Sequence, residues 1–329
     1  MTLRDRPVLV APDSFKGTMS APTVAAAIAS GLERAGLHAD RCPVADGGEG
    51  TMGVLFERLG GELIEAPASD PLGRPITATF ALLGDGMTAL VEVAAASGLY
   101  LVACNDRDAE AASSAGTGQL IASAIDLGAT HVLVAAGGSA TTDGGVGAVG
   151  AIEKAGGLCG ARLTVLCDVR TPFEQAAAVF APQKGADDAA VARLTRRLKA
   201  LEVPRGVPMS GAAGGLAGGL WHWLDANLVA GAPYVLDALE FDARMLASAA
   251  VIVGEGRLDV TSLEGKIAAE IATRARQNGV SAYAVVGTDA IDRFDARILD
   301  LQQIIEAGDE PTLEAAGFEL ARAIAPDTG

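Results

Sequence analysis

Short apolar runs of β type alternate along this chain with helical stripes, and each run ends in a cluster of glycine and polar residues. Three such runs cover residues 8–11, 131–135 and 251–253. This alternation is typical of α/β proteins whose sheets are largely parallel. Ligands of open parallel sheets bind beyond the carboxyl ends of the strands, so the glycine-rich clusters at those ends are candidate sites.

The charge balance excludes several classes of partner. The 329 residues include 25 Lys and Arg against 41 Asp and Glu, which gives a net charge of −16. A chain with this balance lacks the basic surface that binds nucleic acids or anionic lipids. If its ligand is an anion, the few cations must be gathered locally. Lys16, Lys184 and Lys266 each adjoin a glycine, where a compact ammonium group is suited to phosphate.

Cysteine and histidine spacing and the apolar runs limit the classes of site and the cellular location that the sequence supports. The four cysteines form no C-x-x-C pair, which indicates free thiols in a reducing cytoplasm. The first twelve residues have no signal-peptide pattern, and Glu92 interrupts the longest candidate for a membrane span. None of the three histidines stands at metal-ligand spacing to another, so a His-based zinc site or a Ser-His-Asp triad is poorly supported. We therefore expect a cytoplasmic protein with no membrane or nucleic-acid partner.

Two glycine-containing loops precede predicted helices in the first fifty residues. The segment 13–17 places an acid, the Ser14 hydroxyl and the Lys16 ammonium before a helix N-terminus, a combination that favours anion binding. In the segment 46–51, three glycines allow close approach to the backbone, while Asp46 and Glu49 could hold Mg²⁺ or accept a proton. An ordinary capped turn is the structural alternative at each loop.

The segment 137–145 carries the strongest local signal. Four glycines bracket three hydroxyls and Asp143, directly after a predicted strand and before a predicted helix. Backbone N–H groups and hydroxyls in such a loop suit phosphate oxygens and a hydroxyl that must be activated. The loop is not a Walker A motif, because the chain contains no G-x-x-x-x-G-K-[ST] sequence.

A fourth loop, at 254–266, contains three acids and two cations. Glu255 and Asp259 alternate there with Arg257 and Lys266, a set that could bind a metal–phosphate ligand or form only a solvated ion-pair loop. Asp168 at a strand end and the segment 182–185 are weaker signals by themselves. The glycine-rich segment 211–219 is equally consistent with close helix packing and with nucleotide binding.

Taken together, these segments resemble the bacterial glycerate kinases of the type-1 family. The matching stretches are APDSFKG (11–17), VADGGEGT (44–51), GTGQLI (116–121), GGSATTDGG (137–145), CDV (167–169), PQKGA (182–186), GAAGGL (211–216) and GEGRLDVTSLEGK (254–266). The resemblance implies ATP-dependent phosphorylation of D-glycerate with Mg²⁺, giving 2-phosphoglycerate. It also implies a Rossmann-like α/β domain of residues 1–72 and 242–329, a second α/β domain inserted at 73–241, and an active site in the cleft between them.

A working hypothesis distributes the site residues among four roles, in a monomer or homodimer that binds D-glycerate and ATP. The catalytic candidates are Lys16, Asp46, Asp143 and Asp168; the ATP-binding candidates are Ser14, Gly138, Ser139, Thr141 and Lys266; the substrate-binding candidates are Gly47, Gly48, Lys184 and Arg257; and the metal-binding candidates are Glu49, Glu255 and Asp259. Either Asp143 or Asp168 would accept the proton of the glycerate hydroxyl.

One departure from the family pattern keeps alternatives open. Family members carry several tens of further residues where this chain has only the segment 156–162, and Thr142 replaces a common Asn. The shortening favours, as alternatives, a non-catalytic or altered-specificity relative, or a kinase of another small hydroxy acid. A Rossmann-type oxidoreductase is disfavoured because the G-x-G-x-x-G fingerprint is missing.

Overall fold

The chain forms two compact units in the computed structural model, which describes residues 5–15, 17–264 and 266–325. Unit 1 consists of Met1–Asp46 and Ala232–Gly329, and unit 2 of Gly47–Gly231. The sequence instead placed the divisions at 72/73 and 241/242. The first division falls earlier because strand β3 (Gly61–Ser69) pairs with β4 (Pro75–Leu83) of unit 2. The placement of the active site between two domains stays a prediction.

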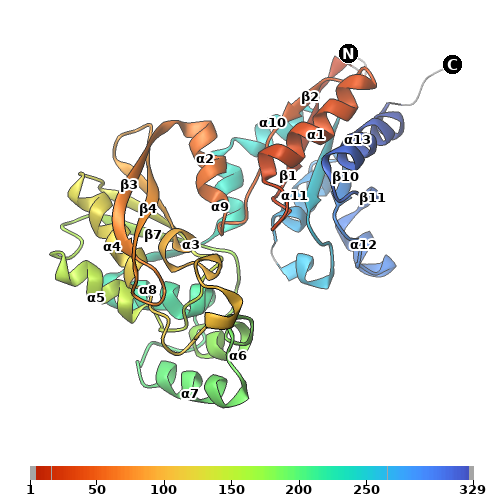
Figure 1. The fold of residues 1–329 in the computed structure, drawn as a ribbon. Coiled ribbons are helices and arrows are strands. Elements are labelled where there is room, and N and C mark those ends of the chain that lie inside the picture. The colour runs from red at the N-terminus through yellow and green to blue at the C-terminus, as the bar shows by residue number, and fades with distance from the viewer. Residues whose placement is uncertain (1–4, 16, 265, 326–329) are drawn as a thin grey trace. The chain divides into compact units, whose positions relative to one another are not determined.

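Unit 1 contains a five-stranded sheet in which every strand is parallel to its neighbours (Figure 1). The sheet has the order β11-β10-β9-β1-β2, and its strands are β1 (Val8–Pro12), β2 (Ala39–Arg41), β9 (Ala250–Glu255), β10 (Ser281–Val286) and β11 (Leu301–Glu306). The order reverses between β1 and β9, because β2 lies on one side of β1 and the later strands lie on the other.

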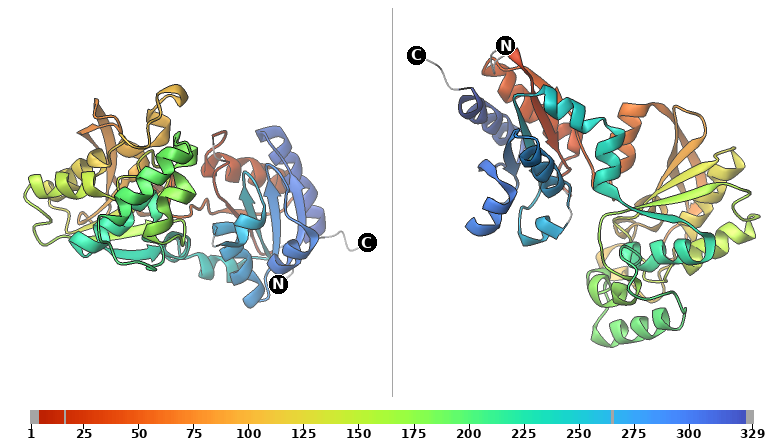
Figure 2. Two further views of the ribbon diagram at one scale, coloured as in Figure 1. Left: turned by 90° about the horizontal axis from the view of Figure 1, so that it is seen from below. Right: turned by 180° about the vertical axis from the view of Figure 1, so that it is seen from behind.

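Helices cover both faces of the unit 1 sheet (Figure 2). On one face, α1 (Ala21–Arg34) and α13 (Glu310–Ile324) lie side by side and share a core with β1, β9 and β10. Gly31 allows the two helices to approach closely, because a Cβ at this position would overlap the Glu314 carbonyl oxygen. The Ser20 side chain caps α1, as its position before the apolar stripe predicts. On the other face, α11 (Ile267–Gln277) packs on β9 and β10. The remaining helices between residue 231 and the C-terminus are α9 (Gly231–Ala238), α10 (Phe241–Ala247) and α12 (Arg293–Leu299).

Unit 2 contains a six-stranded mixed sheet of the order β3-β4-β5-β6-β7-β8. The strands after β4 are β5 (Thr88–Glu92), β6 (His131–Ala135), β7 (Arg162–Cys167) and β8 (Asn227–Ala230). These four strands are mutually parallel, whereas β3, β4 and β5 pair antiparallel. The parallel core of the sheet confirms the predicted α/β class. The strands β3, β4 and β8 were not predicted.

The helices of unit 2 surround two hydrophobic cores. They are α2 (Thr51–Leu59), α3 (Val93–Ser97), α4 (Ala115–Asp126), α5 (Val146–Lys154), α6 (Ala176–Phe180), α7 (Asp188–Lys199) and α8 (Leu216–Leu224). The larger core joins the sheet with α4, α5 and α8, and the smaller one lies under α6 and α7. Among the described residues, no helix has the length and apolar character that a membrane crossing requires.

Candidate functional site

Unit 1 has a pocket of about 430 Å³ at the carboxyl ends of its parallel strands. The loops after β1, β2, β9, β10 and β11 form its wall, which is lined by Asp13, Ser14, Phe15, Thr18, Asp46, Glu255, Gly256, Arg257, Lys266, Gly287, Thr288 and Gly308. The pocket lies where the strand order reverses between β1 and β9, which is the usual ligand position in open α/β sheets. Its volume is in the range of pockets that hold cofactors.

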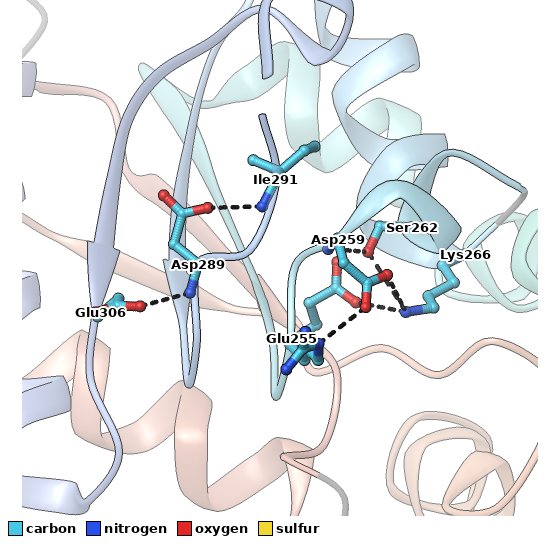
Figure 3. Close-up of polar contacts among 8 residues, drawn as sticks. Glu255, Asp259, Ser262, Lys266, Asp289, Ile291 and Glu306 are labelled. Atoms are coloured by element: carbon cyan, nitrogen blue, oxygen red, sulfur yellow. Dashed lines mark hydrogen bonds and ion pairs between the residues drawn. The ribbon is translucent and has the colours of Figure 1, made fainter. Parts of the chain in front are cut away.

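A compact charged cluster lies on one side of this pocket (Figure 3). The Lys266 ammonium is 3.4 Å from Glu255 Oε2 and 3.9 Å from Asp259 Oδ1. Its Nζ also lies 3.4 Å from the hydroxyl oxygen of Ser262. The side chain of Lys266 remains 36% exposed, so its charge can reach a ligand in the pocket.

Glu255 has the properties of a ligand-binding carboxylate. Its Oε2 faces Lys266, while its Oε1 is buried and has no hydrogen-bond partner among the described residues. Burial raises the pKa of Glu255, and the neighbouring Lys266 ammonium opposes that rise. A buried carboxylate oxygen without a partner is costly, so a bound donor or cation would stabilise it.

The other sequence candidates of unit 1 have different surroundings. Ser14 and Asp46 line the pocket as expected, whereas Lys16 lies outside the described residues. Arg257 also lines the pocket, but its side chain is 63% exposed and its Nε donates to Asp259 Oδ2 at 3.0 Å. Sequence reasoning gave no role to Asp13, a buried pocket residue whose Oδ1 accepts the Ser14 backbone N–H at 2.6 Å.

In unit 2, three predicted loops meet at the carboxyl end of the sheet. A Cβ placed on Gly137 would lie 2.5 Å from Gly48 Cα and 3.3 Å from Asp168 Oδ2. A Cβ on Gly138 would lie 3.1 Å from Glu49 Oε2. The loop after β6 therefore contacts both the segment that begins α2 and Asp168 after β7, and only glycine allows the approach at residue 137. Gly47 packs in the same segment, where a Cβ would lie 2.5 Å from Gly231 Cα.

Asp143 acts as an acceptor for the backbone of two helices. Its Oδ2 accepts the Ser114 N–H and the Ser114 hydroxyl, both at 2.8 Å, and the Gly147 N–H at 3.2 Å. Its Oδ1 accepts the Gly145 N–H at 3.1 Å. These contacts tie the starts of α4 and α5 together and occupy the carboxylate.

Glu92 is a site-forming residue that sequence reasoning missed. It ends β5, and its Oε1 accepts the backbone N–H groups of Gly50 and Met52 at 2.9 and 2.8 Å. Burial raises the pKa of Glu92, and the negative charge of Glu49 adds to that rise. The carboxylate holds the N-terminus of α2 and with it the Gly47–Gly50 loop. The only signal in the sequence was a lone acid at the end of an apolar run.

The remaining candidates of unit 2 surround a buried ammonium group. Lys184 is 2% exposed, and its Nζ donates to Ser139 Oγ at 2.9 Å and to the Thr141 carbonyl at 2.6 Å. The hydroxyl oxygens of Thr141 and Thr142 are buried without a hydrogen-bond partner among the described residues. Lys184 is therefore held inside the protein by the loop 137–145.

The predicted metal ligands do not form a three-residue cluster. Among the described residues, no group of three or more His, Cys, Asp or Glu side chains is arranged to hold a metal ion. Glu255 and Asp259 belong to unit 1 and share Lys266, whereas Glu49 belongs to unit 2 and is exposed. Mg²⁺ needs only one or two protein carboxylates when phosphates supply further ligands.

Comparisons with known proteins agree on one family. The model of the glycerate kinase family matches residues 8–155 and 153–323. A glycerate kinase of Bacillus subtilis is 37% identical over 87% of this chain and 86% of its own length. A glycerate 2-kinase of Escherichia coli is 35% identical over 85% of each chain. A crystal structure of a protein assigned as glycerate kinase 2 from Salmonella typhimurium LT2 has a TM-score of 0.79 and 29% identity, and it covers 97% of this chain and 98% of its own.

Proposed function

Because this chain belongs to the glycerate kinase family, we propose that it transfers the γ-phosphoryl group of ATP to the 2-hydroxyl of D-glycerate, giving 2-phosphoglycerate and ADP. The observation that carries the proposal is the unit 1 pocket, in which the Lys266 ammonium and a buried carboxylate oxygen without a partner meet at the strand-order reversal. Lysine and helix or loop N–H groups at such a position are suited to phosphates.

In this proposal, the unit 1 pocket binds the phosphates of ATP. Lys266 would neutralise phosphate charge, and the hydroxyl of Ser14 would donate a hydrogen bond to a phosphate oxygen. Glu255 and Asp259 would hold Mg²⁺, which neutralises developing negative charge during phosphoryl transfer. The partnerless Oε1 of Glu255 supports this assignment, because a hard cation prefers carboxylate oxygens.

Unit 2 would bind D-glycerate and activate its hydroxyl. Asp168 would accept the hydroxyl proton as that oxygen forms a bond to phosphorus and the bond between phosphorus and the ADP oxygen breaks. Asp143 is not proposed for this step, since its carboxylate already accepts four hydrogen bonds. The glycerate carboxylate would lie at the glycine-rich loop 137–145, whose backbone N–H groups can bind an anion.

The shortened segment does not favour a non-catalytic relative. Residues 155–161 lie between the end of α5 and the start of β7, and therefore at the amino edge of the unit 2 sheet. The two family-model matches meet at residues 153–155, next to this turn. The loops proposed to bind substrate follow β6 and β7 and lie at the opposite, carboxyl edge. The missing residues would thus extend a surface away from these loops.

A coupled assay of ADP release tests the proposal. The purified protein is given ATP and Mg²⁺ with D-glycerate, L-glycerate, glycolate or D-lactate. We expect ADP release that requires D-glycerate and metal, and phosphorus NMR should assign the product as the 2-phosphate. Turnover with a different acid alone would make the protein a kinase of another hydroxy acid. Saturable D-glycerate binding without ADP release would favour the non-catalytic alternative.

A further inference from the structure

The buried ammonium of Lys184 connects two parts of the glycine-rich loop 137–145. Lys184 ends the short helical turn Pro182–Lys184, and Gly185 follows it at a φ of +92°, a conformation that favours glycine. This turn directs the side chain inward, where Nζ reaches Ser139 Oγ and the Thr141 carbonyl oxygen. All of these residues belong to unit 2.

The contact between Lys184 and Ser139 leaves the hydroxyl hydrogen of Ser139 available for a further hydrogen bond. An ammonium group can only donate, so Ser139 Oγ must accept from Lys184. The hydroxyl hydrogen of Ser139 is then left for another acceptor, and Ser139 is 8% exposed. A bound ligand at this loop could supply that acceptor through a carboxylate or hydroxyl oxygen.

The loop is also held from its other sides. The Ala140 N–H donates to the Ser97 carbonyl and the Leu99 N–H donates to the Gly138 carbonyl, both at 2.8 Å. A Cβ on Gly214 would overlap the Thr141 carbonyl oxygen, so the segment 211–216 packs directly against the loop. The backbone of the loop is therefore fixed by neighbouring segments, and the Ser139 side chain is oriented by Lys184.

Burial of the Lys184 ammonium destabilises the fold, so packing alone does not explain its position. Burial lowers the pKa of Lys184 to about 7, although the carboxylates of Asp143 and Asp168 oppose that change. A buried cation destabilises a fold unless its contacts compensate for lost hydration, and such groups cluster at functional sites. Lys184 also places positive charge near the proposed proton acceptor Asp168.

We propose that Lys184 is a positioning residue that acts through Ser139: it fixes the hydroxyl of Ser139 so that this group donates a hydrogen bond to an oxygen of the bound hydroxy acid. The inference rests on the proposed function for the identity of that acid. It replaces the expected direct contact between Lys184 and the substrate, because the ammonium is enclosed by the protein and already bonded to the loop.

A double-mutant cycle tests whether Lys184 acts through Ser139. The variants are Lys184→Met, Ser139→Ala and the double variant, assayed for D-glycerate and ATP kinetics. We expect each single variant to lower kcat/KM for D-glycerate by about 10- to 100-fold, because small misplacements of a contact have effects of this size. The KM for ATP should change by less than about twofold, and the double variant should be no more than about threefold worse than the poorer single variant.

A matched control separates positioning from stability. Thr164 in β7 is also buried and makes a 2.9 Å hydrogen bond to His131 Nε2, away from the loop. Thr164→Val should therefore lower the melting temperature while leaving kcat/KM within about twofold. If the kcat/KM losses of the two single variants multiply in the Lys184 and Ser139 double variant, the two residues act independently. That result would overturn the proposal and leave Lys184 with a structural role only.

A second measurement remains informative even if the wild-type protein lacks kinase activity. Amide hydrogen exchange would be recorded for the wild type, Lys184→Met and Thr164→Val. We expect faster exchange at Ala140 and its neighbours in the loop only in Lys184→Met, since removal of the ammonium releases Ser139 and Thr141. An inactive wild type would count against the proposed function, whereas unchanged loop exchange in Lys184→Met would count against the positioning role.

Discussion

The two units contain lysines in opposite environments. Lys266 of unit 1 is about one-third exposed, lines a pocket and lies 3.4–3.9 Å from two carboxylates. Lys184 of unit 2 is almost completely buried and is bonded to a hydroxyl and a backbone carbonyl. The first ammonium can exchange its partners for a ligand, whereas the second is an internal part of the loop. A glycine neighbour in the sequence thus marks a position near a ligand loop without specifying whether the lysine touches the ligand.

The largest loss of activity should follow from a substitution that separates the loop at Gly137 from the loop at Gly48. Gly137→Ala would place a Cβ 2.5 Å from Gly48 Cα, so one of the two loops must move. We expect activity to fall by more than about 100-fold and stability by about 1–3 kcal/mol. Gly150→Ala is the control, since nothing lies within 4 Å of its added Cβ on helix α5 and alanine favours helix. Retained activity in Gly137→Ala, measured beside this control, would show that loop contact is dispensable.

Removal of the exposed ammonium should affect catalysis more than folding. We expect Lys266→Met to lower kcat/KM for ATP by about 100-fold, because a cation would be lost from the proposed phosphate site. The melting temperature should change little, since the ion pair is partly solvated. Lys199→Met, at an exposed position of α7, serves as the control. Equal ATP kinetics for both variants would remove Lys266 from the phosphate site.

The buried ammonium should instead produce a pH-dependent stability. Lys184 has a folded-state pKa of about 7, below its ordinary value of 10.5, so between these values the unfolded chain binds more protons than the folded one. Stability therefore rises with pH across this window, by an amount on the order of a few kcal/mol. Denaturant unfolding at pH 7 and pH 10 should show this rise in the wild type and a smaller rise in Lys184→Met. Parallel pH dependences would mean that Lys184 titrates normally.

The smallest effect should come from Arg257. Its guanidinium is mostly exposed and pairs with Asp259, and exposed pairs of this kind contribute about 0–1 kcal/mol. Arg257→Met should therefore leave the unfolding midpoint nearly unchanged. If the guanidinium binds ligand, the KM for one substrate should rise while kcat remains similar. A large loss of stability would show that the pair with Asp259 has a greater structural role than its exposure indicates.

Sequence patterns located the loops better than they assigned the residues within them. The loops 137–145 and 254–266 were predictable because each follows an apolar strand with a dense cluster of glycine and polar residues. The bonding of Asp143 was not, because it depends on Ser114, which approaches Asp143 only in the folded chain. The hairpin of β3 and β4 was also missed, because β3 is largely exposed and lacks a strong apolar pattern.

The most direct test of the division between the two lysines is a calorimetric titration with Mg–ATP in the absence of D-glycerate. The account predicts that Lys266→Met weakens ATP binding by about tenfold or more, whereas Lys184→Met binds ATP within about twofold of the wild type. Loss of ATP binding in Lys184→Met together with wild-type binding in Lys266→Met would contradict it.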